Sequence, residues 1–311
     1  MGANYSEIQE LLQQKADIQA RLNLMPYDGN PEIKESNSSK YLYMRKRVAG
    51  KLTSTYVDVY SDELYQLLLR NAKERKDLNK AIRKINKDLE ALGYEDKELS
   101  ARVLQNLDFA RANLKANIYD QAVLEGVATT FPQTEDIIEN GQVNGVSATD
   151  VQKILNLKHA WEFILDRDVI QSESNYHMLC HIAKLVNEGF FYDGGRIRGI
   201  PVQIGGTSYV PLPIETVVIE RIDEIRSQDK EPIEIAIELC MYCMKTQVFK
   251  DGNKRASVIF ANHYLIAQGM GFLVIPEKDV PEFKKLLVQY YEGEPLEIIG
   301  AFLKERCWKN F

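Results

Sequence analysis

One short loop of the 311-residue chain gathers the side chains best suited to binding a phosphate. It has an acid, a glycine, an amide and two cations in succession: Asp251, Gly252, Asn253, Lys254 and Arg255. A glycine lets the backbone approach a ligand closely, and the amide and the cations can hold its oxygens. A carboxylate is a hard oxygen ligand of the kind that Mg²⁺ prefers. The loop therefore predicts a site for a metal-bound di- or triphosphate.

The segments on either side of this loop are predicted to be buried helices. Residues 233–246 and 255–267 are strongly apolar and long enough for helices, so the loop lies at the N-terminus of the second one. The first N–H groups of a helix have no partner within it, and the helix dipole favours an anion there. We therefore expect the second helix to point its N-terminus at the phosphates.

Residues 247–258 resemble the signature of the Fic/Doc family, H-x-F-x-(D/E)-G-N-(G/K)-R-x-x-R. The matching positions are Phe249, Asp251, Gly252, Asn253, Lys254 and Arg255. Gln247 stands where the signature has its catalytic histidine, and Val258 stands where it often has a second arginine. A simple helix-capping turn would account for Gly252 and Asn253, but it leaves the crowded charges unexplained.

The resemblance implies ATP and Mg²⁺ as ligands, and transfer of part of the nucleotide to a Ser, Thr or Tyr hydroxyl of a target protein. By position, Gln247 and Arg255 would be the catalytic residues and Asp251 the metal ligand. The residues implied to bind the nucleotide are Phe249, Gly252, Asn253, Lys254 and Arg255. In the family a histidine takes the proton from the hydroxyl, whereas the Gln247 amide has no proton acceptor that titrates near neutral pH. We therefore expect nucleotide binding to persist and turnover to be weak or altered.

Three functions stay open at this point. The leading hypothesis is a protein adenylyltransferase, which AMPylates its target protein with ATP. The missing histidine also fits a catalytically silent protein that binds a nucleotide or a partner. Lys254, where many members have glycine, also fits a Doc-like phosphotransferase.

A second segment, residues 118–130, resembles the inhibitory helix that some family members carry, with the pattern (S/T)-x-x-x-E-(G/N). Glu125 and the glycine after it match this pattern, whereas Gln121 replaces the Ser or Thr. In the family this glutamate pairs with the second arginine, which is Val258 here. Either one of the two loop cations replaces that arginine, or Glu125 is only a helix C-cap.

Residues 194–206 resemble the β-hairpin flap over the family's active site, with glycines around β-branched residues. An exposed hairpin edge can capture an extended target segment by strand addition. The residues expected to dock a target are Arg196, Ile197, Arg198, Val202 and Ile204. Together with helical segments 150–165 and 176–189, the resemblance implies a mainly α fold, with a Fic-type helical core and a β-hairpin flap in residues 101–311.

The first 100 residues are predicted to form a separate module of a helix, a β-hairpin and a long helix. Residues 4–23 and 62–92 have helical spacing, and 40–60 read as a hairpin after a polar linker at about 31–40. The hairpin carries tyrosines beside cations: Tyr41, Tyr43, Arg45, Lys46, Arg47, Lys51 and Tyr56. Such a set can bind nucleic acid, but lysine and arginine also guard exposed sheet edges, and we expect that simpler role.

The four histidines offer no replacement for the missing base. His263 lies eight residues beyond Arg255, about 12 Å along the predicted helix. His177 and His181 are four residues apart, but no acid or cysteine nearby completes a metal site, so we expect packing roles. His159, beside a tryptophan, is interpreted as structural.

The composition is that of a globular protein, with 45% apolar and 27% charged residues. A net charge of −6 argues against a general nucleic-acid binder. No apolar run reaches the length of a bilayer span, and the four cysteines suit a reducing compartment. We therefore expect a cytoplasmic protein without membrane contact, and a homodimer stays open.

Overall fold

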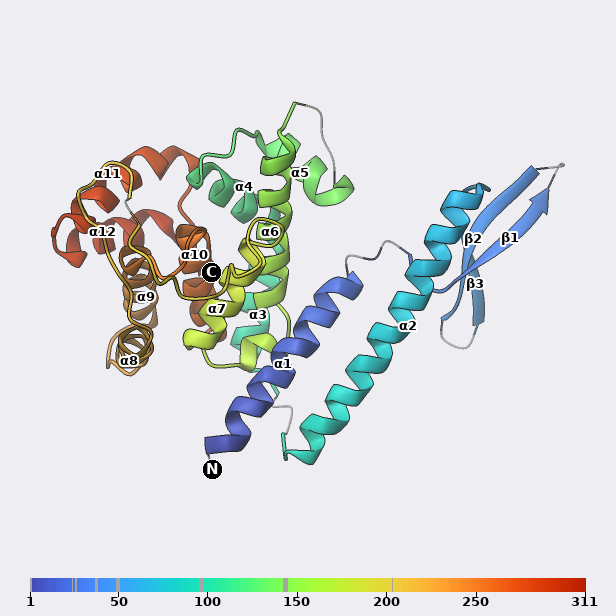
Figure 1. Ribbon diagram of the computed structural model, residues 1–311, viewed down its shortest axis with the longest axis horizontal. Helices are drawn as coiled ribbons and strands as arrows, with labels where there is room; N and C mark the ends of the chain where they lie inside the picture. Colours follow the sequence, from blue (N-terminus) through green and yellow to red (C-terminus); the bar gives the residue numbers. More distant parts are fainter. Residues whose placement is uncertain are drawn as a thin grey trace. The chain divides into compact units, whose positions relative to one another are not determined.

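The computed structural model describes residues 2–311 except residues 24, 26, 37–38, 49–50, 95–97, 142–144 and 203. The chain divides into two compact units, Met1–Asp96 and Lys97–Phe311 (Figure 1). Most of each unit is helical, so the predicted mainly α fold is confirmed. Among the described residues, none of the helices combines the length and apolar character of a bilayer span.

The N-terminal unit contains two helices and a three-stranded antiparallel sheet. Its elements are α1 (Gly2–Asn23), β1 (Asn30–Ser36), β2 (Ser39–Val48), β3 (Lys51–Val59) and α2 (Asp62–Ala91). The sheet order is β1-β2-β3, with Ile33 opposite Leu42 and Tyr43 opposite Tyr56. The predicted hairpin is the β2–β3 pair. The prediction of a linker at 31–40 was wrong, because residues 31–36 pair with β2 as strand β1, and Ser39 and Lys40 already belong to β2; residues 37–38 lie outside the described residues.

Apolar contacts hold the elements of this unit together. Leu42 and Met44 belong to one cluster with Leu68 of α2, which covers one face of the sheet. Leu12 of α1 packs in a second cluster with Ile85 of α2. Each helix therefore uses one apolar stripe, and the charged residues that remain on α2 face solvent.

The second unit is built around α10 (Asn253–Ala267). The other helices are α3 (Ala101–Ala112), α4 (Leu114–Leu124), α5 (Phe131–Asn140), α6 (Ala148–Ile164), α7 (Tyr176–Val186), α8 (Glu215–Arg226), α9 (Pro232–Thr246), α11 (Val280–Tyr291) and α12 (Leu296–Phe302). The short elements are η1 (Val169–Gln171), η2 (Glu277–Asp279), η3 (Leu303–Cys307) and the paired strands β4 (Phe272–Leu273) and β5 (Trp308–Lys309). Because α6, α7 and α9 all pack against α10, most of its residues are buried and its N-terminus is held in place.

Val258, at the position where the family often has a second arginine, is part of the apolar core. Its side chain is fully buried. It belongs to an apolar cluster with Leu124 of α4, Met241 of α9 and Leu287 of α11. An arginine here would place a charge among apolar side chains, so the apolar valine suits the surroundings of this position.

The flap segment differs from its prediction. Residues 194–206 form turns and bends, with no strand among those that the structure describes; Gln203 lies outside them. The backbone N–H of Arg198 donates to the Val248 carbonyl at 3.0 Å, and its guanidinium donates to three more backbone carbonyls. The segment is therefore anchored through one arginine rather than through pairing with a second strand.

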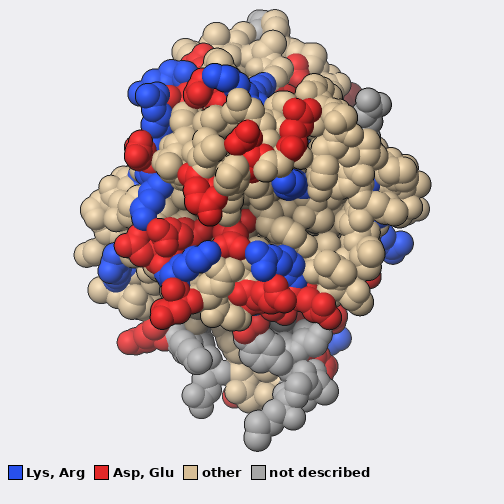
Figure 2. All heavy atoms as spheres, turned by 90° about the vertical axis from the view of Figure 1, so that its left-hand side faces the viewer, with Lys and Arg blue, Asp and Glu red and all other residues tan. Residues whose placement is uncertain are grey.

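The face formed by α8, α9, α11 and α12 mixes acidic and basic side chains (Figure 2). Lys304 Nζ lies 2.7 Å from a Glu231 oxygen and 3.1 Å from a Glu234 oxygen. Glu238 accepts a hydrogen bond from Arg221 at 2.9 Å. The described residues of this face therefore form a mixed surface rather than a basic one.

Candidate functional site

Asn253 fixes the shape of the loop between α9 and α10. Its Oδ1 accepts from the Phe249 backbone N–H at 2.9 Å, and its Nδ2 donates to the Phe249 carbonyl at 2.8 Å. Gln247 ends α9 in the left-handed region, with φ of 50°, and no other non-glycine residue of the described chain has a positive φ. Gly252, with φ of 73°, turns the chain into α10. The helix N-terminus is thus preceded by a backbone of defined shape.

An open cleft of about 340 Å³ lies in front of this loop. Several predicted site residues line it: Glu125, Gln247, Asp251, Gly252, Asn253 and Lys254. Val202 and Ile204 of the flap and Lys284 and Tyr291 of α11 form other parts of its wall. A cleft at a helix N-terminus, with lysines on its wall, suits an anionic ligand.

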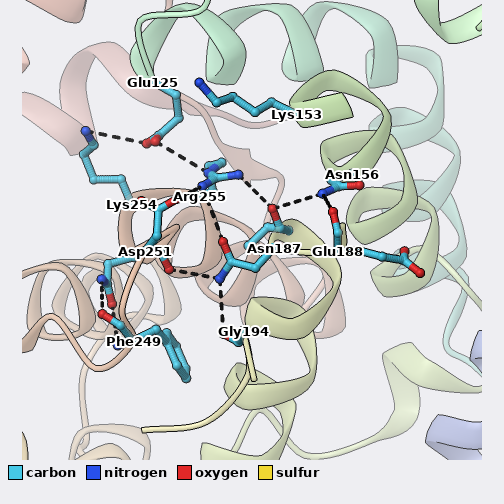
Figure 3. A network of polar contacts seen from close by, with 12 residues as sticks. Glu125, Lys153, Asn156, Asn187, Glu188, Gly194, Phe249, Asp251, Lys254 and Arg255 are labelled. Carbon is cyan, nitrogen blue, oxygen red and sulfur yellow. Dashed lines mark hydrogen bonds and ion pairs between the residues drawn. The ribbon is translucent and has the colours of Figure 1, made fainter. Parts of the chain in front are cut away.

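Two residues predicted to bind the nucleotide lie behind the cleft wall. Phe249 and Arg255 are almost fully buried. Arg255 Nη1 donates to the Val186 carbonyl at 2.7 Å, and its Nη2 pairs with the Asp251 carboxylate at 2.8 Å (Figure 3). The guanidinium therefore braces the loop against α7. Its Nε is also buried, has no hydrogen-bond partner among the described residues and lies 3.5 Å from a Glu125 oxygen.

The Gln247 amide, at the position of the missing base, is engaged at both ends. Its Nε2 donates to the Met244 carbonyl at 2.7 Å, and its Oε1 accepts from Asn253 Nδ2 at 3.2 Å. Tyr291 also hydrogen-bonds Gln247, and burial raises the pKa of that phenol. The amide thus fixes the loop, and it offers no group that takes a proton near neutral pH.

Glu125 faces both loop cations (Figure 3). Its carboxylate oxygens lie 3.6 Å from Lys254 Nζ and 3.5 Å from Arg255 Nε. Glu125 Oε1 and Arg255 Nε are both buried without a hydrogen-bond partner in the described part of the chain. Gln121 ties α4 to α10, because its Nε2 donates to the Arg255 carbonyl at 2.9 Å. The Glu125 carboxylate is therefore close to both cations, but its Oε1 and the Arg255 Nε make no hydrogen bond.

Asp251 is the one residue predicted to bind a metal. Its side chain is 53% exposed and its carboxylate is shared with Arg255. The described residues contain no group of three or more His, Cys, Asp or Glu that could hold an ion. Mg²⁺ usually takes one or two carboxylates and completes its shell with substrate phosphates and water. The donor set thus fits a metal that arrives with a nucleotide, and it does not fit a metal held by protein alone.

Asn187 links the flap to the loop, a role that the sequence did not indicate. It follows α7 and is fully buried. Its Nδ2 donates to the carbonyls of Gly194 at 3.1 Å and Asp251 at 3.0 Å (Figure 3). In sequence, an asparagine at a helix end is indistinguishable from an ordinary cap. Only its tertiary contacts reveal that it positions the loop.

Lys284 of α11 is a second residue that the sequence analysis missed. Lys284, Leu287 and Tyr291 line the cleft, and their spacing of three and seven residues places them on one helix face. Lys284 makes no ion pair with described residues, whereas Lys250 of the loop pairs with Asp193 at 2.6 Å. A cation within an otherwise apolar helical stripe was the signal that could have predicted it.

The predicted docking residues of the flap fall into two groups. Val202 and Ile204 line the cleft, and Arg196 is exposed. Ile197 is half-buried, and Arg198 is only 1% exposed with its guanidinium donors engaged. Burial lowers the pKa of Arg198. Arg198 therefore holds the flap in place and offers no docking group, in contrast to its predicted role.

None of the four histidines, all within the described residues, lines the cleft. His263 is fully buried, with its Nε2 2.9 Å from the Val169 carbonyl and its Nδ1 2.7 Å from Ser174 Oγ. Burial lowers the pKa of His263 to about 4. His181 stacks on Phe163 at 4.6 Å between ring centroids. The site has no imidazole available as a base.

Comparison with known proteins shows which family the helical core resembles. Residues 174–265, which run from the segment before α7 into α10, match the Fic/DOC family. The chain thus contains a Fic/DOC family domain. Residues 5–66 match a domain of unknown function, DUF6788. No curated protein matches the sequence.

Three solved structures are similar in fold. Fic-1 (residues 134–508) from C. elegans is 19% identical with a TM-score of 0.54, over 78% of this chain and 75% of that one. A Fic domain containing signaling protein from Bacteroides thetaiotaomicron is 18% identical with a TM-score of 0.50, over 67% and 82%. A Fic family protein from Desulfovibrio desulfuricans is 16% identical with a TM-score of 0.52, over 68% and 75%. At these identities the similarity concerns the fold alone, and it confirms the predicted Fic-like fold.

Proposed function

We propose that the cleft binds ATP with Mg²⁺ and that the protein transfers AMP to a Ser, Thr or Tyr hydroxyl of a target protein, at a weak or altered rate. The observation that carries the proposal is the N-terminus of α10, which opens on the cleft between Asp251 and Lys254. Unpaired N–H groups, the helix dipole and a lysine all favour phosphate oxygens at this point. The match of residues 174–265 to the Fic/DOC family supports the same reaction class.

Several residues of the loop have a role in this proposal. Gly252 lets the phosphates approach the backbone, Lys254 contacts them from the cleft wall, and the buried Arg255 guanidinium adds positive charge behind it. Asp251 would hold Mg²⁺, which neutralises charge on the phosphates when it is bound. The target hydroxyl oxygen bonds to the α-phosphorus and pyrophosphate leaves. The proton of the target hydroxyl passes to water, because Gln247 cannot accept it. Placement and charge neutralisation supply most of the rate in such reactions.

One observation favours a second function, nucleotide binding without transfer. The Gln247 amide is engaged at Met244 and Asn253, so it neither accepts a proton nor is free to orient a hydroxyl. A general base typically contributes about 10²–10⁴-fold to such a step. A protein that lacks it would keep most of its ligand affinity and lose most of its turnover.

Glu125 acts in this proposal as an inhibitory group. It lies within 3.6 Å of Lys254 and 3.5 Å of Arg255, the cations assigned to the phosphates. Glu125 and Lys254 both line the cleft, so a phosphate oxygen that approaches Lys254 also meets the carboxylate. ATP therefore competes with the carboxylate for Lys254, and the cleft binds ATP more weakly than it would without Glu125.

The flap is proposed to position the target protein. Val202 and Ile204 present apolar side chains on the cleft wall beside the loop. An extended segment of a target could lie against them with its hydroxyl toward the phosphates. Arg196 is the exposed cation of the same segment.

Incubation with ATP labelled either at the α- or at the γ-phosphate tests the proposal, with a cell extract as the source of target. Label from the α-phosphate alone on protein is the expected result, at a slow rate. Label from the γ-phosphate would instead indicate the Doc-like phosphotransfer that Lys254 leaves open. Binding of ATP without either label would support the silent function. Absence of ATP binding by calorimetry would overturn both assignments of the cleft.

A further inference from the structure

The sheet of the N-terminal unit has one covered face and one open face. Leu42 and Met44 of β2 lie on the side of α2, in the cluster with Leu68. Alternate residues of a strand point to opposite faces, so their neighbours in β2 point away from α2. Within this unit, no described helix lies on that second side of the sheet (Figure 1).

The open face joins tyrosines to cations from all three strands. Its members are Lys34, Tyr41, Tyr43, Arg45, Arg47 and Tyr56, and we name this set the aromatic-basic face. The rings of Tyr41 and Tyr43 lie 6.3 and 5.6 Å from the ring of Tyr56. Lys34 Nζ lies 4.5 Å from the ring centroid of Tyr43. Tyr56 itself is 51% exposed, so its ring can be reached by a ligand.

The charge of the aromatic-basic face favours an anionic partner. The carboxylate of Glu32, on the edge strand β1, is already used, since it pairs with Arg45 at 3.6 Å and Lys34 at 3.8 Å and accepts from Ser54 Oγ at 3.1 Å. Arg47 makes no ion pair with any described residue. Asp58, near Tyr56, is the other acid beside the tyrosines. Three cations therefore share this face with one neutralised carboxylate and one acid at its margin.

Strand order removes the simpler explanation for these cations. Lysine and arginine protect a sheet when they lie on an edge strand, where backbone groups are unpaired. Arg45 and Arg47 lie on β2, which pairs with β1 on one side and with β3 on the other. Because β2 is the central strand, its cations have no edge to protect.

We infer that the aromatic-basic face binds a nucleic-acid strand. Arg47 and Arg45 would contact phosphates, whose charge dominates such binding. Tyr56 would stack on a base, an interaction that accepts any sequence because every base has a π-face. An acidic protein segment would satisfy the arginines but would leave the exposed ring of Tyr56 without a planar ligand. The inference concerns a different unit from the cleft and does not depend on its proposed function.

Binding is measured with the full chain, by fluorescence anisotropy of a labelled 20-nucleotide single strand and of the corresponding duplex. The variants are Arg47→Ala and Tyr56→Ala. Lys46→Ala is the matched control, because it removes one charge from the same strand at a residue that alternates to the other face. Tyr56→Phe keeps the ring, and circular dichroism verifies that each variant is folded. Poly-glutamate of similar length serves as a control ligand, a polyanion that has no bases.

The expected result is salt-dependent binding of at least one nucleic acid. Arg47→Ala should reduce the slope of log affinity against log salt by about 0.7–0.9, while Lys46→Ala leaves it unchanged. Tyr56→Ala should weaken binding of an unpaired strand about 5- to 150-fold, and Tyr56→Phe should retain it. The measurements with the single strand and the duplex distinguish two modes of binding. Tighter binding of the single strand shows that the face contacts unpaired bases. No binding to either, equal losses at Arg47 and Lys46, or equally tight binding of poly-glutamate would overturn the inference.

Discussion

A β-carbon at Gly252 would lie 2.7 Å from Oδ1 of Asn187, closer than real side chains approach. Asn187 cannot retreat easily, because its amide donates to Gly194 and Asp251. Gly252 also has φ of 73°, a conformation that strains any other residue. The loop and the end of α7 are therefore fitted to each other at a point where only a glycine leaves room.

Gly252→Ala is expected to destabilise the second unit by about 2 kcal/mol or more, from backbone strain and the close contact together. Gly141→Ala is the matched control, because Gly141 has φ of 71° and a β-carbon added there would meet no atom within 4 Å. The free energy of unfolding in urea measures both. In an Asn187→Ala background, Gly252→Ala should lower the free energy of unfolding no more than Gly141→Ala does. Equal costs at the two glycines in the wild-type background would contradict the contact.

Glu125→Gln is expected to lower the dissociation constant for ATP by about tenfold, because it frees the cations and removes a charge repelling the phosphates. Calorimetric titration measures this change. The amide has almost the same shape and helical tendency as the acid, so it separates charge from the capping role at the end of α4. If Glu125→Gly changes affinity while Glu125→Gln does not, the glutamate acts as a cap and not as an inhibitor.

Lys284→Ala is expected to weaken ATP binding by about 3- to 10-fold at low salt, since its ammonium lies on the cleft wall without an ion partner among the described residues. Lys285→Ala is the control, because the next lysine pairs with Glu282 at 4.0 Å. The difference between the two variants should shrink at high salt. Identical affinities would remove Lys284 from the site.

Gln247→His is expected to raise the rate of α-phosphate labelling by about 10²–10⁴-fold. Histidine tolerates the left-handed backbone conformation at this position better than most residues. Gln247→Ala serves as the control, since it also breaks the contacts with Met244 and Asn253 but adds no base. Should both variants label protein equally slowly, the site lacks more than its base.

His263 is expected to make folding stability depend on pH. Burial lowers its folded pKa to about 4, below the ordinary value of 6.5, so between these values the unfolded chain binds a proton that the folded chain does not. Its contribution is therefore present above pH 6.5 and is lost as the pH falls toward 4, by about 3 kcal/mol in total. Urea unfolding of wild type and His263→Gln at pH 7 and 4.5 measures it, with His177→Gln as an exposed control. If the wild type loses no more stability between pH 7 and pH 4.5 than His263→Gln does, the low pKa assigned to His263 is wrong.

The chemistry of the loop could be predicted from the sequence because it depends on neighbours in the chain. The order of Asp251, Gly252, Asn253 and Lys254 before an apolar helix places polar groups at a helix N-terminus in almost any compact fold. The absence of a base follows equally directly, since the chemistry of Gln247 does not depend on its surroundings. The mainly helical fold was implied by the resemblance of residues 101–311 to the Fic/Doc family, together with the helical spacing of residues 4–23 and 62–92.

Contacts between distant segments could not be predicted in this way. The flap was expected to pair as a hairpin, but Arg198 finds carbonyl partners that no local rule reveals. Residues 31–40 looked like a linker, because a strand can be stabilised by its backbone pairing while its side chains stay polar. Lys284 reaches the cleft only because α11 packs beside the loop.

The sequence by itself determined which chemical groups this protein can offer: a helix N-terminus with cations and one carboxylate beside it, and no histidine at the position of the base. The tertiary structure decided which of them face a ligand. It buried Arg255 against Val186, set Glu125 beside Lys254, and placed the cations of β2 on a central strand. The reason is physical: the identity of a group is local, whereas its exposure and its partners are set by segments that meet only when the chain folds.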